Sequence, residues 1–120
     1  MGKFLNPLHM REDNGFCVRL SKPLLYVSAV EFPTETYCVP KNFRSDFASI
    51  PRFLWPILPP HGRVKKAAVL HDWLYTQPQI PRSLADRIFL EAMTADNVPT
   101  PQRWIMYEAV RLFGWIHRRP

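Results

Sequence analysis

The chain has 120 residues, of which 47% are hydrophobic and 22% charged, and this composition excludes both an intrinsically disordered segment and two separate cores. A formal net charge of +6 favours acidic partners over basic ones. No stretch has the ~18 consecutive apolar residues of a transmembrane helix, and the N-terminus lacks the apolar run of a signal peptide. We therefore expect a single domain over residues 1–120, located in a cytoplasm or in a particle assembled there.

The positive charges are scattered along the sequence and adjoin one another only at Lys65 with Lys66 and at Arg118 with Arg119. No basic and aromatic motif of a known nucleic-acid reader accompanies them, so nucleic acid is not an expected partner. An anionic lipid surface and an acidic protein surface are the candidate partners. Cys17 and Cys38 lie in strand-like stretches, and we interpret them as small buried hydrophobic residues, with a disulfide as the alternative.

Residues 1–40 show the alternation of apolar and polar residues that is typical of short β-strands. The stretches 16–20, 24–30 and 35–39 are rich in β-favouring residues, and residues 13–15 (Asp-Asn-Gly) form a turn signal before the first of them. Pro40 ends the last stretch. These patterns predict one small antiparallel sheet of three or four strands, with one face covered by the elements that follow.

Residues 41–61 form an aromatic and proline-rich connection, which we interpret as a packed lid or site wall with a short helix near residues 49–55. Within residues 62–117, apolar residues recur at helical spacing over 63–77 and 81–96. A third helix over 101–117 is apolar on most of its sides. The predicted fold class is α+β: an N-terminal antiparallel sheet packed with an antiparallel helical hairpin and a C-terminal helix.

A histidine and an aspartate are expected to meet across this hairpin. His71 lies on the apolar face of the first helix, and Asp86 flanks the apolar stripe of the second. Both are almost equally far from the turn near Pro78, so antiparallel packing brings them level. A partly buried carboxylate is costly unless it is paired, and pairing would fix the imidazole tautomer. We predict His71 as a general base oriented by Asp86, with a structural core histidine as the alternative.

Two further carboxylates, Asp72 and Asp46, are candidate metal ligands. Asp72 follows His71 directly, and Asp46 belongs to the connection that is expected to fold back over the start of the first helix. Oxygen ligands favour Ca²⁺ or Mg²⁺, whereas a histidine with carboxylates can hold Zn²⁺ or Mn²⁺. A divalent metal, Ca²⁺ or Zn²⁺, is therefore a candidate cofactor. The alternative for Asp72 is a surface carboxylate near Lys65 or Arg52.

A resemblance to a known family is carried by four segments in fixed order: VPKNFRSDFASIPRFLW, AAVLHDWLY, SLADRIFLEAM and YEAVRLFGW. Together they resemble a family of small phage and prophage proteins that is known only as a domain of unknown function. The resemblance extends from the strands through Gly114 and covers nearly the whole chain. It implies a phage context, and thus a place in the host cytoplasm or the phage particle, without an established activity.

A second resemblance concerns chemistry. The segment AAVLHDWLY is similar to the His-Asp-x-x-Tyr helix of phospholipase A2 enzymes, and ADRIF resembles their Asp-bearing partner helix. The resemblance implies that His71 activates water and that Asp86 orients the imidazole. It also implies that Asp72 binds Ca²⁺ and that Tyr75 supplies a supporting hydroxyl. Residues 45–49 would take the place of the calcium loop.

Two functions remain open at this point. The first is a phage-encoded, hydrolase-like protein that uses His71, Asp86 and Tyr75, with a metal at Asp72 and Asp46. The second is a non-catalytic virion or tail component, or an inhibitor that binds a host protein. Its contact surface would lie on the apolar C-terminal helix, at Trp104, Tyr107, Arg111 and Trp115. The oligomeric state, which the sequence leaves undetermined, discriminates between the two functions.

Overall fold

A computed structural model describes residues 2–12, 18–31, 33–45 and 63–113 of the chain. These residues form short strands followed by long helices, which is the predicted α+β class. The elements in chain order are β1 (Lys3–Phe4), β2 (Met10–Glu12), β3 (Val18–Leu20), β4 (Leu24–Ser28), β5 (Glu35–Val39), β6 (Arg44–Ser45), α1 (Arg63–Tyr75), α2 (Arg82–Ala95) and α3 (Thr100–Phe113).

The strands form two antiparallel sheets of three strands each, and not the single sheet that the sequence predicts. The first sheet has the order β1-β4-β5, and the second has the order β2-β3-β6. The three unpredicted strands, β1, β2 and β6, are only two or three residues long. An alternation of period two cannot be recognised over so few residues, which is why the second sheet was missed.

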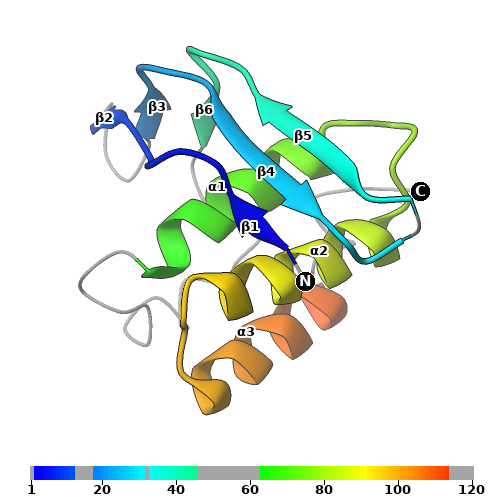
Figure 1. Ribbon diagram of the computed structural model, residues 1–120. Coiled ribbons are helices and arrows are strands. Elements are labelled where there is room, and N and C mark those ends of the chain that lie inside the picture. The colour runs from blue at the N-terminus through cyan, green and yellow to red at the C-terminus, as the bar shows by residue number, and fades with distance from the viewer. Residues whose placement is uncertain (1, 13–17, 32, 46–62, 114–120) are drawn as a thin grey trace.

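The helices cover one side of the first sheet (Figure 1). Helices α1 and α2 form an antiparallel hairpin beneath β1, β4 and β5, and α3 packs against α2 on the side away from the strands (Figure 1). The predicted hairpin and C-terminal helix are therefore present. Within the residues that the structure describes, no helix combines the length and the apolar character that crossing a bilayer requires.

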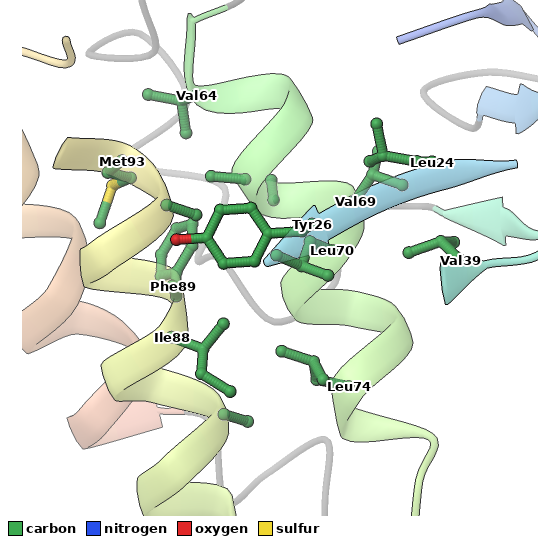
Figure 2. Packing of buried hydrophobic residues seen from close by; sticks show 14 of the residues in the cluster. Leu24, Tyr26, Val39, Val64, Val69, Leu70, Leu74, Ile88, Phe89 and Met93 are labelled. Carbon is green, nitrogen blue, oxygen red and sulfur yellow. The ribbon is translucent and has the colours of Figure 1, made fainter. Parts of the chain in front are cut away.

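Helix α1 is buried on nearly all its sides because strands lie on one side of it and α2 on the other. Four consecutive residues, 67–70, are each at most 2% exposed, although a surface helix would place some of them in solvent. Their partners in the core come from β4, β5 and α2 (Figure 2). The largest buried apolar side chains in this core include Leu24, Tyr26, Val39, Leu70, Leu74, Ile88, Phe89 and Met93.

A polar contact also ties the first sheet to α2. The Glu91 carboxylate accepts hydrogen bonds from the Tyr26 hydroxyl at 2.8 Å and from the Ala29 backbone N–H at 2.9 Å. Helix α2 ends as the sequence predicts, because Asn97 adopts a left-handed conformation (φ 60°) and the Val98 N–H donates to the Met93 carbonyl. These contacts fix α2, the helix that carries Asp86, relative to the strands.

The prediction that Cys38 is buried is wrong. Cys38 is a free, exposed cysteine, not a small buried hydrophobic residue. In the β4–β5 ladder Val39 pairs with Leu24 and points into the core, so its neighbour Cys38 points to the opposite face with Leu25. Cys17 and the predicted short helix at 49–55 lie outside the described residues, as does the C-terminal part of the predicted third helix.

Candidate functional site

The candidate site lies where the three helices meet. His71 stands in the third turn of α1, on the face that the sequence predicts to be apolar, and its side chain is fully buried. The Phe89 ring stacks on the imidazole at 4.6 Å between centroids, and the Tyr75 ring lies 4.2 Å away, one helical turn along α1. Aromatic walls on both sides therefore hold the imidazole in one orientation.

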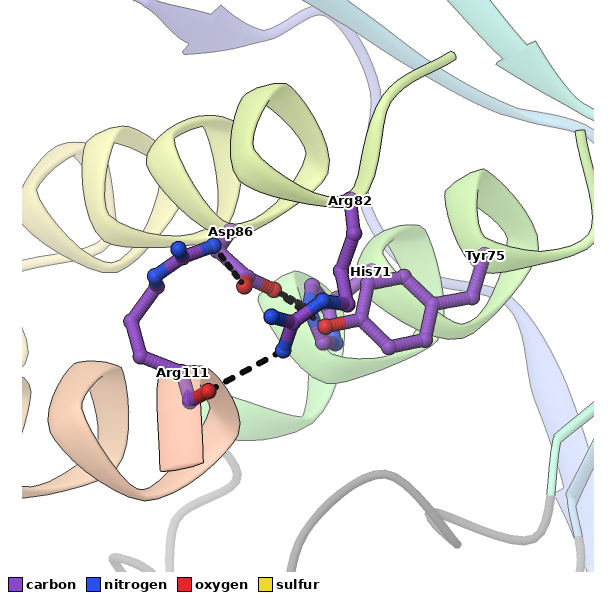
Figure 3. Close-up of polar contacts among 5 residues, drawn as sticks. All are labelled: His71, Tyr75, Arg82, Asp86 and Arg111. Carbon is purple, nitrogen blue, oxygen red and sulfur yellow. Dashed lines mark hydrogen bonds and ion pairs between the residues drawn. The ribbon is translucent and has the colours of Figure 1, made fainter. Parts of the chain in front are cut away.

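Asp86 meets His71 from the facing helix, as the hairpin geometry predicts. The His71 Nε2 lies 2.7 Å from the Asp86 Oδ1, and neither side chain is exposed to solvent. The Tyr75 hydroxyl donates to the same Oδ1 at 2.5 Å. All three sequence-predicted catalytic residues are thus in direct contact (Figure 3), although their catalytic roles remain predictions.

Helix α3 supplies a further partner of Asp86, which the sequence pattern does not place at this site. The Arg111 guanidinium donates from Nη1 to the Asp86 Oδ2 at 2.9 Å, so each carboxylate oxygen has its own donors (Figure 3). Arg82 donates from Nη1 to the Arg111 carbonyl at 3.0 Å, which satisfies a backbone acceptor in the last turn of α3. The network formed by His71, Tyr75, Arg82, Asp86 and Arg111 therefore joins all three helices.

The charges in this network determine the protonation of its members. An ionised carboxylate only accepts hydrogen bonds, so the His71 Nε2 must carry a proton when it contacts Asp86. Arg111 supplies the compensating positive charge that a fully buried carboxylate requires. Burial, and after it the hydrogen bond to Asp86, raises the pKa of the Tyr75 hydroxyl well above its ordinary value. Tyr75 therefore stays a neutral donor in the physiological range.

The predicted metal ligands are only partly described. Asp72 is half-buried and accepts a hydrogen bond from the Ser45 hydroxyl of β6, a contact that ties α1 to the second sheet. Asp46 lies outside the described residues. Among the residues that the structure does describe, no three His, Cys, Asp or Glu side chains lie close enough together to hold a metal ion. The described part of the site therefore does not by itself form a metal centre.

The residues predicted for partner binding separate into two environments. Trp104 is 47% exposed on α3 and packs edge to face against Tyr107 at 5.7 Å. Ile105 and Leu112 are also exposed on this helix. Arg111, in contrast, turns toward Asp86, and Trp115 lies outside the described residues. Of the residues predicted for partner binding, Trp104 is therefore exposed on α3, with Tyr107 packed beside it.

Comparisons with known proteins identify a family whose model covers the part of the chain that holds the site. The family model described as "Protein of unknown function (DUF1353)" matches residues 18–110, a range that contains every predicted catalytic residue. A protein of Sinorhizobium fredii (strain NBRC 101917 / NGR234), "Uncharacterized protein y4jT", is 36% identical over 78 residues, or 63% of this chain. The match spans 23% of that relative's own length. No solved structure matches the chain.

Proposed function

The chain belongs to the DUF1353 family, and we propose that its His71 and Asp86 form the general-base pair of a hydrolase-like site. The observation that carries the proposal is the 2.7 Å contact between the His71 Nε2 and the Asp86 Oδ1, with both side chains fully buried. An oriented imidazole of this kind activates water or a hydroxyl group for attack on an ester or phosphoester.

The chemistry follows from the tautomer. Because Nε2 carries the proton that Asp86 accepts, the lone pair lies on Nδ1, and Nδ1 is the atom that would remove a proton from the nucleophile. The imidazolium formed in this step is stabilised by the Asp86 carboxylate. Tyr75 and Arg111 hold that carboxylate in place, so they are positioning residues in this proposal.

The metal-assisted, phospholipase-A2-like form of this function is a narrower proposal. Asp72 would hold a Ca²⁺ or Zn²⁺ ion only together with ligands outside the described residues, Asp46 being the first candidate. Such an ion would polarise the carbonyl or phosphoryl oxygen of the substrate. A phage origin, with action in the host cytoplasm or in the particle, is likewise proposed from the sequence motifs alone.

The experiment compares wild type with His71→Gln on short-chain and long-chain p-nitrophenyl esters, bis-p-nitrophenyl phosphate and phosphatidylcholine micelles. Each substrate is tested with EDTA, Ca²⁺ or Zn²⁺. Loss of a general base lowers the rate about 10²- to 10⁴-fold. Glu108→Gln is the matched control, since this exposed residue of α3 lies outside the network. Hydrolysis that persists unchanged in a folded His71→Gln protein would contradict the proposal.

A second candidate function is a non-catalytic protein that binds a phage or host protein through α3. The observation in its favour is the exposure of Trp104 (47%), Ile105 (45%) and Leu112 (64%) on one helix. The polar network would then serve only to hold the three helices together. Analytical ultracentrifugation of wild type and Trp104→Ser tests it. A wild-type oligomer that the substitution dissociates supports this function, whereas a monomer in both cases counts against self-association through α3.

A further inference from the structure

Three arginines that are far apart in the sequence stand in one row across the second sheet. Arg11 of β2 is directly opposite Arg19 of β3, and Arg19 is directly opposite Arg44 of β6. Directly opposite residues of antiparallel strands project from the same face of a sheet. The fold therefore gathers positive charges that the sequence shows as scattered. We call Arg11, Arg19 and Arg44 the arginine row.

The arginine row occupies the outer face of the sheet. Val18, Leu20 and Ser45 alternate with these arginines and are buried, so the opposite face carries the guanidinium groups. Arg11 and Arg44 are exposed and Arg19 is partly exposed. The Arg19 Nη1 donates to the Asn42 carbonyl at 3.1 Å, which holds the central side chain of the row in place along the sheet.

The arginine row runs across the strands of the second sheet. Neighbouring strands are about 4.8 Å apart, so three successive strands spread the guanidinium groups over about 10 Å. A linear polyanion presents negative charges at successive positions along such a row. Guanidinium groups pair in a bidentate manner with phosphate oxygens. We propose that the arginine row binds the phosphodiester backbone of a nucleic acid, without reading its bases.

Two observations favour a nucleic acid over an anionic membrane. Binding at a bilayer surface combines basic residues with apolar side chains that enter the headgroup region. Among the described residues, the large exposed hydrophobic side chains are Leu5 and three residues of α3, and none belongs to β2, β3 or β6. The row is also linear, which fits successive phosphates along a strand. The absence of aromatic residues in these three strands agrees with contacts to the backbone alone.

The test is fluorescence polarisation with labelled 20-nucleotide single-stranded DNA and a 20-base-pair duplex, between 50 and 200 mM NaCl. Three phosphate contacts give a slope of log K against log salt of about −2 for single strands and about −3 for duplex. Over this salt range the affinity falls about 20- to 40-fold. The row variant is Arg11→Gln/Arg19→Gln/Arg44→Gln. The control, Lys3→Gln/Lys65→Gln/Arg87→Gln, removes the same net charge from other exposed positions.

The proposal predicts that the row variant loses binding and most of the salt slope, whereas the control keeps both. The single variants Arg11→Gln and Arg44→Gln, both at exposed positions, should each lower the slope of log K against log salt by about 0.7–0.9. These single variants replace the triple variant should it fail to fold. Equal losses in the row variant and the control would overturn the proposal, because net charge alone would then explain binding. So would row-dependent binding to polyglutamate or to phosphatidylglycerol vesicles without binding to DNA.

Discussion

Replacement of Asp86 by alanine tests whether the buried network holds the three helices together. The substitution removes the acceptor for His71, Tyr75 and Arg111 in one step. Arg111 can be rehydrated because 34% of its side chain is exposed, but the Nε2–H of the fully buried His71 cannot. Breaking a buried ion pair from one side costs about 3–5 kcal/mol. That is a large part of the 5–15 kcal/mol by which a domain is typically stable.

The assay is urea unfolding followed by circular dichroism, together with a thermal melt. We expect Asp86→Ala to lower the melting temperature by about 10–20 °C, at roughly 4 °C per kcal/mol for a chain of this size. Arg111→Ala, which leaves the fully buried Asp86 carboxylate without its cation, should also cost about 3–5 kcal/mol. In the double variant the two costs should not add, since both act on the same carboxylate. A cost below about 1 kcal/mol for Asp86→Ala would refute the reasoning.

Two further predictions concern tyrosines and a glycine. Burial raises the pKa of Tyr26 and of Tyr75 above 10.0, so their contribution to stability is complete below pH 10 and is lost as pH rises further. The pKa of the partly buried Tyr37 is raised in the same direction, so all three tyrosines make stability fall as pH rises above 10. Tyr75→Phe should reduce the slope of stability against pH by about 1.4 kcal/mol per pH unit, and an unchanged slope would contradict this. A Cβ at Gly2 would lie 1.9 Å from the Tyr26 hydroxyl. Gly2→Ala should therefore lower the free energy of unfolding, measured in urea, by about 1–3 kcal/mol. An unchanged free energy of unfolding would be inconsistent with this packing.

The helical part of the fold could be predicted because its signals are long and agree with one another. Apolar spacing and the turn near Pro78 locate α1 and α2 to within a few residues, and the short hairpin places His71 level with Asp86. The second sheet could not be predicted, because strands of two or three residues owe their pairing to tertiary contacts. Cys38 was misplaced because strand propensity does not indicate which face of a strand is buried.

The parts of the site that the sequence did not reveal come from separate elements. Arg111 belongs to a helix that the sequence shows as apolar on most of its sides, and this pattern predicts a contact surface, whereas the structure turns Arg111 toward Asp86. A second charge for the buried Asp86 was nevertheless required by the cost of burying a carboxylate, and that requirement was the available signal. Ser45 could not be matched to Asp72 because their contact depends on how the second sheet packs on α1. The alignment of the arginine row likewise depends on strand register.

The protonation of the His71 ring tests the general-base account most directly, without knowledge of the substrate. We would measure the ¹⁵N chemical shifts of both ring nitrogens in histidine-labelled protein at pH 7.5, with His71→Gln to assign the signals. The account predicts a protonated Nε2 that is hydrogen-bonded to Asp86 and an Nδ1 that carries the lone pair. A proton on Nδ1 with a bare Nε2 would contradict it, because the Asp86 contact would then no longer orient a base.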